Sequence, residues 1–414
     1  MTMPFRFRQI AVFVLIALFL SGYCGVSSAQ LTNKDLPDRE GVKVGIGDLR
    51  LHGAFKLGEE LETNIFLRPS DRKTDGISLI NPSVGFELPL RNNMISADYD
   101  AGIFLYNQYS SQNHADHRMR ALAEFNLSRF KIKVSEIGRI YTDRSADEIS
   151  NRIKRGTNDL RAGIEGQFEK FGFDVGFSNK FDGYDSQVSI IRTLIYKDKN
   201  RFTNAIDATL SYRFRPKTLA LVENDTGYLD YYHSPDVPNS FYNETLIGIR
   251  GEWFHRMNLN FKIGLRYQAY ESSDIISDKR YIGPVFRGGF DYSVTDDDLI
   301  VFTLKRANYE STYQYINYYD ANLVGLDYRH NFNDKIYGTL FGSYQLNLYP
   351  GETIENGETA KRYDNYLGGG ASLRYDIRKW LSAEARYEYK QRICKFDVFD
   401  YVDHVVTIRG TAGF

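Results

Sequence analysis

The chain has 414 residues, a formal net charge of -1 and 25% charged residues, so it carries no basic surplus with which to bind nucleic acid. Its mean hydropathy of -0.43 is typical of a water-soluble protein. Aromatic residues nevertheless make up 15% of the chain, with 31 Tyr and 28 Phe but only 2 Trp. A transmembrane β-barrel reconciles these values, because only every second residue of its strands needs to be apolar.

Residues 1–29 have the three zones of a secretory signal peptide. The basic residues Arg6 and Arg8 are followed by the apolar run Ile10–Leu20 and by a small-residue site that ends at Ala29. The apolar run is shorter than the roughly 18 to 20 residues that span a bilayer as a helix. We therefore expect cleavage after Ala29, a short periplasmic lead over residues 30–47 and a barrel over residues 48–414.

The two cysteines do not predict a disulfide. Cys24 lies in the signal segment, and its removal leaves Cys394 alone in the mature chain. Cys24 follows Tyr23, whereas lipid attachment to a cysteine needs a small preceding residue, so a lipoprotein is disfavoured. Without a disulfide, hydrogen bonds between strands must close the fold.

Apolar and polar residues alternate with a period of two in segments of about ten residues, as in barrel strands. In the run Leu259–Ala269 the two kinds separate completely onto opposite faces, and Leu381–Lys390 repeats the pattern. Strands of a soluble β-sandwich could alternate in the same way. The lengths of the connections distinguish the two folds, since outer-membrane barrels have short periplasmic turns and longer extracellular loops.

Short and long links alternate along the chain, which favours the membrane barrel. The short links lie near Arg91-Asn92-Asn93, Phe130, Lys170, Pro216, His255-Arg256, Thr295–Asp298, Asn333-Asp334 and Arg378-Lys379. The long links are Glu59–Asp75, Ser110–Arg118, Asp143–Thr157, Gly183–Arg201, Ser234–Asn239, Ser272–Lys279, Glu310–Ala321, Tyr349–Arg362 and Cys394–Asp400. Together they predict an all-β, antiparallel, up-and-down transmembrane barrel of about 18 strands with both ends in the periplasm. A barrel of that size has room for an aqueous channel.

Aromatic residues gather at the short links, as in the aromatic girdle of a membrane protein. They are Phe130, Phe168, Phe171, Phe214, Trp253, Phe254, Tyr292, Phe332 and Trp380. The last segment alternates from Val406 to the terminal Phe414, which is similar to the signal by which outer-membrane barrels are recognised for assembly. We therefore expect the bacterial outer membrane as the location of the chain.

Charged residues at the polar strand positions are the candidate pore lining. Twelve of them are the primary candidates: Asp98, Asp100, Arg161, Glu165, Asp207, Arg250, Lys262, Arg266, Arg287, Arg374, Glu384 and Arg386. The same alternation adds Asp174, Glu252, Asp291, Asp327, Glu388, Arg129, Arg213, Arg329, Lys390 and Arg409. The two signs nearly balance, so ion pairs between neighbouring strands are one interpretation, and a selectivity surface for charged solutes is the other.

No motif predicts catalysis, a cofactor or a metal. His114, Asp116 and His117 could supply metal ligands, but they are few and fall on an expected loop. Gly368-Gly369-Gly370 lies inside an alternating strand, without the helix of a phosphate-binding loop, and indicates a bend or a close side-chain approach. The sequence contains no Gly-x-Ser-x-Gly nucleophile motif. We expect no catalytic residue.

Three stretches near the N-terminus resemble the opening of the putative β-barrel porin 2 family. They are Glu62–Leu67, Asp71–Asp75 and Ile80–Phe86, and Asp116-His117-Arg118 adds a further similarity. The resemblance implies an outer-membrane barrel that works with exopolysaccharide or capsule export systems. It also implies separate periplasmic and inner-membrane export components as partners, because the chain lacks a periplasmic polysaccharide-export domain.

The sequence therefore indicates passage through a pore, with export of an extracellular polysaccharide as the role that the resemblance implies. A general or solute-specific diffusion porin is the first alternative, and a non-transporting structural or adhesive barrel is the second. The other expected partners are outer-membrane lipid and the barrel-assembly machinery, with no nucleic acid.

Overall fold

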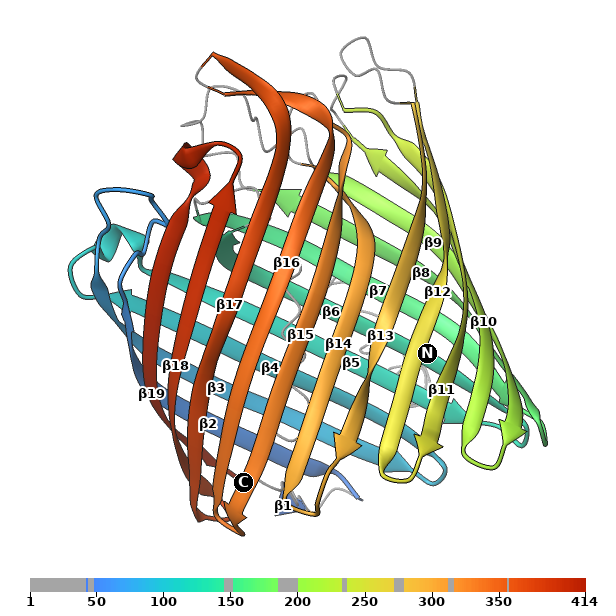
Figure 1. Ribbon diagram of the computed structural model, residues 1–414. Helices are drawn as coiled ribbons and strands as arrows, with labels where there is room; N and C mark the ends of the chain where they lie inside the picture. Colours follow the sequence, from blue (N-terminus) through green and yellow to red (C-terminus); the bar gives the residue numbers. More distant parts are fainter. Residues whose placement is uncertain are drawn as a thin grey trace, which may run out of the picture.

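The chain forms a closed antiparallel β-barrel of 18 wall strands, β2 to β19 (Figure 1). The computed structural model describes residues 42–43, 48–144, 152–184, 200–232, 237–271, 279–311, 316–355 and 357–414. The expected signal peptide, residues 1–29, and most of the expected lead, residues 30–47, lie outside the described residues. The expected all-β barrel and its strand number are confirmed.

The elements follow one another along the chain. They are β1 (Val42–Lys43), β2 (Arg50–Glu62), β3 (Asp75–Leu90), β4 (Asn93–Tyr106), η2 (Ser110–Gln112), β5 (His114–Asn126), β6 (Phe130–Arg144), β7 (Arg152–Gln167), β8 (Phe171–Tyr184), β9 (Arg201–Arg215), β10 (Thr218–Tyr231), β11 (Ser240–Phe254), β12 (Met257–Tyr270), β13 (Arg280–Ser293), β14 (Asp298–Glu310), β15 (Tyr318–Asn333), β16 (Ile336–Glu355), β17 (Glu358–Arg378), β18 (Leu381–Cys394), η4 (Asp397–Phe399) and β19 (Tyr401–Gly413). The short β1 pairs with β2 at the base of the wall.

The last strand closes the barrel against the first wall strand. Residues 405–413 of β19 pair with residues 54–62 of β2. The terminal residue extends this seam, since the Phe414 amide donates to the Gly53 carbonyl at 3.0 Å and the Gly53 amide donates to the Phe414 carbonyl at 3.2 Å. The expected role of Phe414 as an assembly signal stays a prediction.

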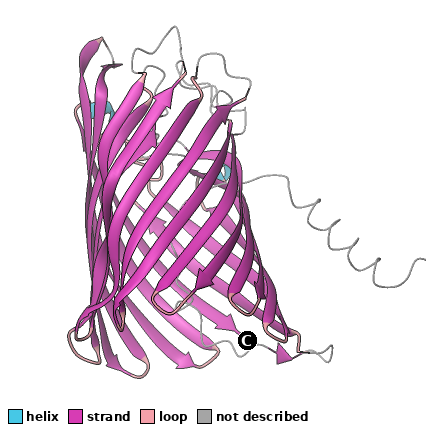
Figure 2. Ribbon diagram, turned by 90° about the vertical axis from the view of Figure 1, so that its right-hand side faces the viewer, coloured by secondary structure: helices cyan, strands magenta, loops and turns pink. Residues whose placement is uncertain are grey.

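The two ends of the barrel differ as the link lengths predict. Tight turns join the strands at the end where the C-terminus lies, and the longer connections lie at the opposite end (Figure 2). The prediction of a loop over 349–362 is wrong. Over 349–362 the strands β16 and β17 continue as a hairpin to Glu355 and from Glu358, with a register shift between Leu348 and Glu352.

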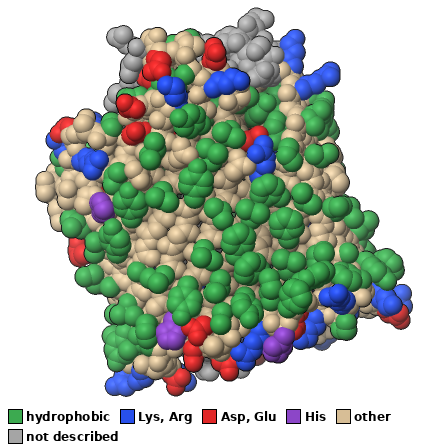
Figure 3. Space-filling model, in the orientation of Figure 1, with side chains coloured by type: hydrophobic (Ala, Val, Ile, Leu, Met, Phe, Trp, Pro, Cys, Tyr) green, Lys and Arg blue, Asp and Glu red, His purple; other side chains and the backbone are tan. Residues whose placement is uncertain are grey.

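Apolar side chains cover the outer face of the wall (Figure 3). In β12, for example, Ile263, Leu265 and Tyr267 are exposed, and the alternate residues Lys262 and Arg266 face the lumen. Aromatic rings are exposed at the tight-turn end, including Phe171, Phe254, Phe332 and Trp380. Within the described ranges, no helix is long and apolar enough to cross a membrane.

The assignment of wall faces predicts opposite outcomes for arginine at two adjacent positions. Leu210 lies on the outer face of β9 and is 62% exposed, and Thr209 points inward between Asp174 and Glu223 in the register. Leu210→Arg should reduce the free energy of unfolding by about 2 to 4 kcal/mol, because its charge enters hydrocarbon. Thr209→Arg should leave that free energy nearly unchanged, because water and two carboxylates surround the new charge.

Urea titrations of each variant in lipid vesicles measure both values through the faster gel mobility of the folded barrel. Equal losses for the two variants would contradict the assigned faces.

Candidate functional site: the lining of the lumen

The twelve primary candidates all lie at inner-face positions of the wall. Asp98 and Asp100 come from β4, Arg161 and Glu165 from β7, and Asp207 from β9. The remaining seven, Arg250, Lys262, Arg266, Arg287, Arg374, Glu384 and Arg386, come from β11, β12, β13, β17 and β18. Their role in passage stays a prediction. Of the further candidates that the alternation predicts, Arg129 falls in the turn before β6 and not on a strand.

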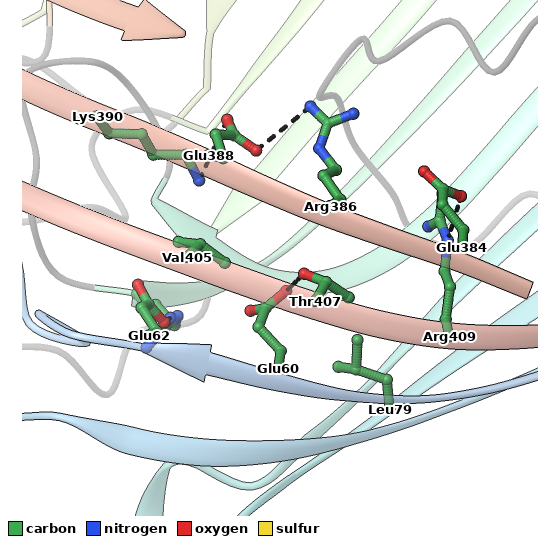
Figure 4. Close-up of a pocket in the computed structure, with 11 residues that line it drawn as sticks. Glu60, Glu62, Leu79, Glu384, Arg386, Glu388, Lys390, Val405, Thr407 and Arg409 are labelled. Atoms are coloured by element: carbon green, nitrogen blue, oxygen red, sulfur yellow. Dashed lines mark hydrogen bonds and ion pairs between the residues drawn. The ribbon is translucent and has the colours of Figure 1, made fainter. Parts of the chain in front are cut away.

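A charged strip crosses β18, β19 and β2 on the inner face (Figure 4). It consists of Glu60, Glu62, Glu384, Arg386, Glu388, Lys390 and Arg409. Arg409 Nη2 lies 2.7 Å from Glu384 Oε2, and Glu388 lies between Arg386 at 3.4 Å and Lys390 at 3.6 Å. A recess of about 270 Å³ runs along these side chains, so most of them remain hydrated.

The first long loop packs against the inside of the wall next to this strip. Ile65 is 1% exposed and contacts the inward-facing Ile77 and Tyr106. Arg152, at the start of β7, donates to the Ile65 carbonyl at 3.0 Å and to Glu62 Oε2 at 2.8 Å. These bonds join β2 to β7 across four intervening strands. The loop therefore narrows the lumen near its extracellular end.

The tip of this loop stays in water. Lys73 Nζ lies 2.5 Å from Asp71 Oδ1, and this hydrogen bond lowers the pKa of the exposed Asp71 carboxyl. Both side chains are exposed, so the pair contributes little to stability. The narrowing depends instead on Ile65 and Arg152.

On another part of the wall, Arg161 binds two carboxylates. Its Nη2 lies 2.7 Å from Asp174 Oδ1 and 2.5 Å from Asp207 Oδ2, and its Nε donates to Asp207 Oδ1 at 3.0 Å. A second recess of about 230 Å³ opens here, with Lys180 and Asp225 among its lining residues. The bidentate geometry fixes the Arg161 guanidinium against the wall.

A third group of charges links β10 to β13. Glu223 pairs with Lys262, and Glu244 pairs with Arg287. Arg266 lies 3.5 Å from Glu244 Oε2, with its guanidinium 4.2 Å from the centre of the Tyr242 ring. These residues therefore form ion pairs between nearby strands, as the first interpretation of the lining predicts.

One part of the lining has a surplus of positive charge. Arg118 and Arg139 are direct cross-strand partners on β5 and β6, and Arg120 is two residues from Arg118. The facing carboxylates are Asp100, 3.6 Å from Arg120, and Asp98, which also bonds His52 at 2.9 Å. Like charges opposite each other destabilise a sheet. This basic cluster of Arg118, Arg120 and Arg139 is therefore a candidate for attracting anions into the lumen.

Near the extracellular end a buried ion triad holds β17 and β18 together. Asp364 accepts bonds from Arg362 at 2.7 and 2.9 Å and from Arg392 at 2.7 Å, and all three side chains are at most 1% exposed. The Cys394 thiol also donates to Asp364 Oδ1 at 2.8 Å. The Arg362 guanidinium lies 4.6 Å from the centre of the Phe399 ring. This end of the lumen is filled with side chains on the β16–β18 side.

The sequence pattern misses several lining residues because it places them in loops. Glu60 and Glu62 fall in the predicted link that begins at Glu59, where two adjacent glutamates interrupt the alternation. Arg152 and Arg362 likewise fall in predicted links. The alternation of Phe55, Leu57 and Leu61 could have extended β2 to Glu62, but no local signal predicts that Arg152 reaches it.

The possible metal triad is excluded by geometry. His114, Asp116 and His117 lie on strand β5 and not on a loop. His114 and Asp116 face inward, and His117 faces outward, where its Nδ1 lies 2.7 Å from the Tyr99 hydroxyl. The two imidazoles therefore cannot bind one ion. The described residues contain no group of three or more His, Cys, Asp or Glu side chains that could hold a metal.

Removing the carboxylate from the ion triad should destabilise the barrel. Asp364→Ala leaves two buried guanidiniums without their shared partner, which should cost about 3 to 5 kcal/mol of unfolding free energy. Asp376→Ala is the matched control. Its 2.8 Å pair with Arg374 is on the same strand but partly exposed and should contribute at most about 1 kcal/mol. Urea titration in vesicles measures both losses, and equal losses would contradict a special role for the triad.

No curated protein matches the sequence. Two of the similar solved structures are OpdK of Pseudomonas aeruginosa with vanillate, at 8% identity, and OccAB3 of Acinetobacter baumannii, at 9%. OpdK is matched over 88% of this chain and 99% of its own, with a TM-score of 0.47. OccAB3 is matched over 89% and 100%, with a TM-score of 0.48.

The family described as "Putative beta-barrel porin 2" matches residues 38–412, nearly the whole chain. The resemblance carried by the N-terminal stretches is thereby confirmed, as is the outer membrane as the location. The family and the fold point to a transport channel and not to an enzyme. The chain belongs to the "Putative beta-barrel porin 2" family and is an outer-membrane β-barrel porin.

Proposed function

We propose that the protein is a passive diffusion channel for small hydrophilic solutes. The observation that carries this proposal is the inner face of a closed 18-strand wall lined with partly exposed charges of both signs. Side chains such as Arg161, Glu388 and Arg409 remain 27% to 37% exposed within their ion pairs. A hydrated, polar lining lets a solute exchange water for protein hydrogen bonds without a large desolvation cost.

Two features that narrow the lumen indicate that the solutes are small. The loop residue Ile65 and the Arg152–Glu62 pair narrow the lumen on one side, and the Asp364 triad fills the β16–β18 side at the extracellular end. Both features reduce the space that is left for a solute at the extracellular end. Balanced charge over most of the wall gives weak ion selectivity, to which the basic cluster adds a preference for anions.

Polysaccharide export remains the alternative, and it rests on the family resemblance alone. The separate periplasmic and inner-membrane components that export would need, and the assembly machinery expected to recognise Phe414, also remain predictions. If export is the role, deleting the gene should abolish surface polysaccharide. Normal polysaccharide in the deletion strain, together with slower uptake of small solutes, would contradict export and support diffusion.

The basic cluster predicts the direction of a selectivity change. Replacing Arg118 and Arg120 with alanine removes two lumen-facing positive charges and should raise the potassium-to-chloride permeability ratio by about twofold or more. Reversal potentials in planar bilayers under a salt gradient measure the ratio. Ile408→Ala, a lipid-facing change, is the control and should leave it unchanged. Absence of any channel current from the folded wild-type protein would contradict the diffusion channel itself.

A further inference from the structure

The seam between β13 and β14 is closed only in its lower half. Pairing runs from Ser293↔Leu299 to Phe286↔Arg306 and then stops. Both strands continue as strands, β13 to Arg280 and β14 to Glu310. Within the described chain, residues 280–285 pair only with β12 and residues 307–310 only with β15. In Figure 1 the two ribbons diverge above this point.

The divergence falls in the membrane. Phe286 lies six residues above the inner-girdle residue Tyr292, which is about 15 Å along the barrel axis for a tilted strand. The apolar band of an outer-membrane barrel is about 25 Å tall. The open part of the seam therefore faces the outer leaflet, where exposed Ile282 and Leu265 still belong to the lipid face.

The free edge of β13 is adapted to the missing partner. Pro284 lies on this edge and has no N–H group, so the strand presents no unsatisfied donor there. The Pro284 carbonyl accepts a bond from Arg306 Nε at 3.1 Å. Arg306 also donates to Asn322 Oδ1 at 2.8 Å and to Asp320 Oδ2 at 2.8 Å. Arg306 thus makes one hydrogen bond across the seam where the backbone ladder has ended.

This seam cluster of Arg306, Asn308, Asp320 and Asn322 occupies positions of outward parity on β14 and β15, where a membrane wall normally has apolar side chains. These residues have the same strand parity as the lipid-facing Phe302, Leu304, Val324 and Leu326 below them. Figure 3 shows positive and negative side chains at the surface in the upper part of the apolar band. Ionised groups on the lipid face of a barrel destabilise it and are rare without a function.

Above the cluster the wall overlaps itself. Glu310, on the outer face of β14, accepts bonds from Gln268 Nε2 at 2.5 Å and from the Tyr270 hydroxyl at 3.4 Å. Both donors lie on the inner face of β12, and Gln268 is fully buried. The tip of β14 therefore lies behind β12 and β13, on the lumen side, and a path between the two layers would join the lipid to the lumen.

We propose that this seam is a lateral port, latched by Arg306, through which a single-chain amphiphile with an uncharged, hydroxyl-bearing head moves between the outer leaflet and the lumen. The tail lies against Ile282 and Pro284, and the head enters the seam cluster. Separating the layers by one strand spacing, about 4.8 Å, admits one hydrocarbon chain but not a bulkier lipid.

The chemistry of the seam cluster selects the head. Opening the latch breaks the one bond that crosses the seam, so it frees the Arg306 Nε donor and the Pro284 carbonyl, while Arg306 keeps its ion pair with Asp320 on the paired strand β15. Hydroxyl groups both donate and accept, so one sugar-like head can satisfy both freed groups. A charged head would find no free counter-charge in this poorly hydrated site, because Arg306 and Asp320 already neutralise each other.

Photolabelling tests the port without requiring an ion current, so its failure is distinct from failure of the diffusion proposal. The probe is a dodecyl glucoside with a diazirine on its sugar, dissolved in the lipid around the reconstituted full-length barrel. Labelled residues are read by mass spectrometry on the inner face, at Arg266 and Tyr281, and on the lipid face, at Ile263 and Ile282. Inner-face labelling is expected in the wild-type protein.

A crosslink across the seam should block that labelling. The variant carries Pro284→Cys and Asn308→Cys, and a short bis-maleimide joins the two thiols. These positions would form the next outward-facing pair if the β13–β14 register continued. Cys394 is only 6% exposed and stays in place. The matched control joins Val222→Cys to Ile247→Cys, a lipid-facing pair on the fully paired β10–β11 seam.

Inner-face labelling should fall by roughly fivefold or more in the β13–β14 crosslink and not in the control. In an Arg306→Ala variant without the crosslink it should rise, because the latch is absent. Inner-face labelling that is missing from the wild-type protein, or that survives the β13–β14 crosslink, would overturn the port.

Discussion

Backbone hydrogen bonding in hydrocarbon is the constraint on which the rest of this structure depends. The bilayer core offers no water to an unpaired N–H or carbonyl group, so the sheet must close on itself. The pairing of β19 with β2, extended by Phe414 and Gly53, joins the two ends of the sheet and closes the wall, apart from the upper half of the β13–β14 seam. Once the wall is closed, the alternation of each strand sends apolar side chains to the lipid and polar ones to the lumen.

The second constraint is the access of water to the inner face, which differs along the barrel axis. Where water reaches the wall, ion pairs such as Arg409–Glu384 stay partly exposed, and in the proposed diffusion channel they are the contacts that a solute would exchange. Where loops and side chains fill the extracellular end, the same residue types are buried, and Asp364 must satisfy two guanidiniums at once. Under that proposal, the same residue types would serve passage at one level of the barrel and rigidity at another.

The sequence predicts those parts of the molecule that depend on local alternation. The inward direction of residues such as Lys262 and Arg266 follows from a period of two, and the strand number and the tight-turn girdle follow from the alternation of short and long links. The contact of Arg152 with Glu62 could not be predicted, because it joins strands far apart in the chain. The prediction of a loop over 349–362 failed because polar residues suit a strand that extends beyond the membrane as well as they suit a loop.

The β16–β17 hairpin has a consequence for the cell surface. These strands have 20 and 21 residues, against 13 to 16 in the other wall strands. Six extra residues on a tilted strand add about 15 Å of height, and Figure 1 shows this ribbon standing above its neighbours. A hydrogen-bonded ribbon holds its shape better than a loop of equal length. An antibody, a phage or a neighbouring cell would therefore meet a stiff projection near Gly357 before it met the mouth of the pore.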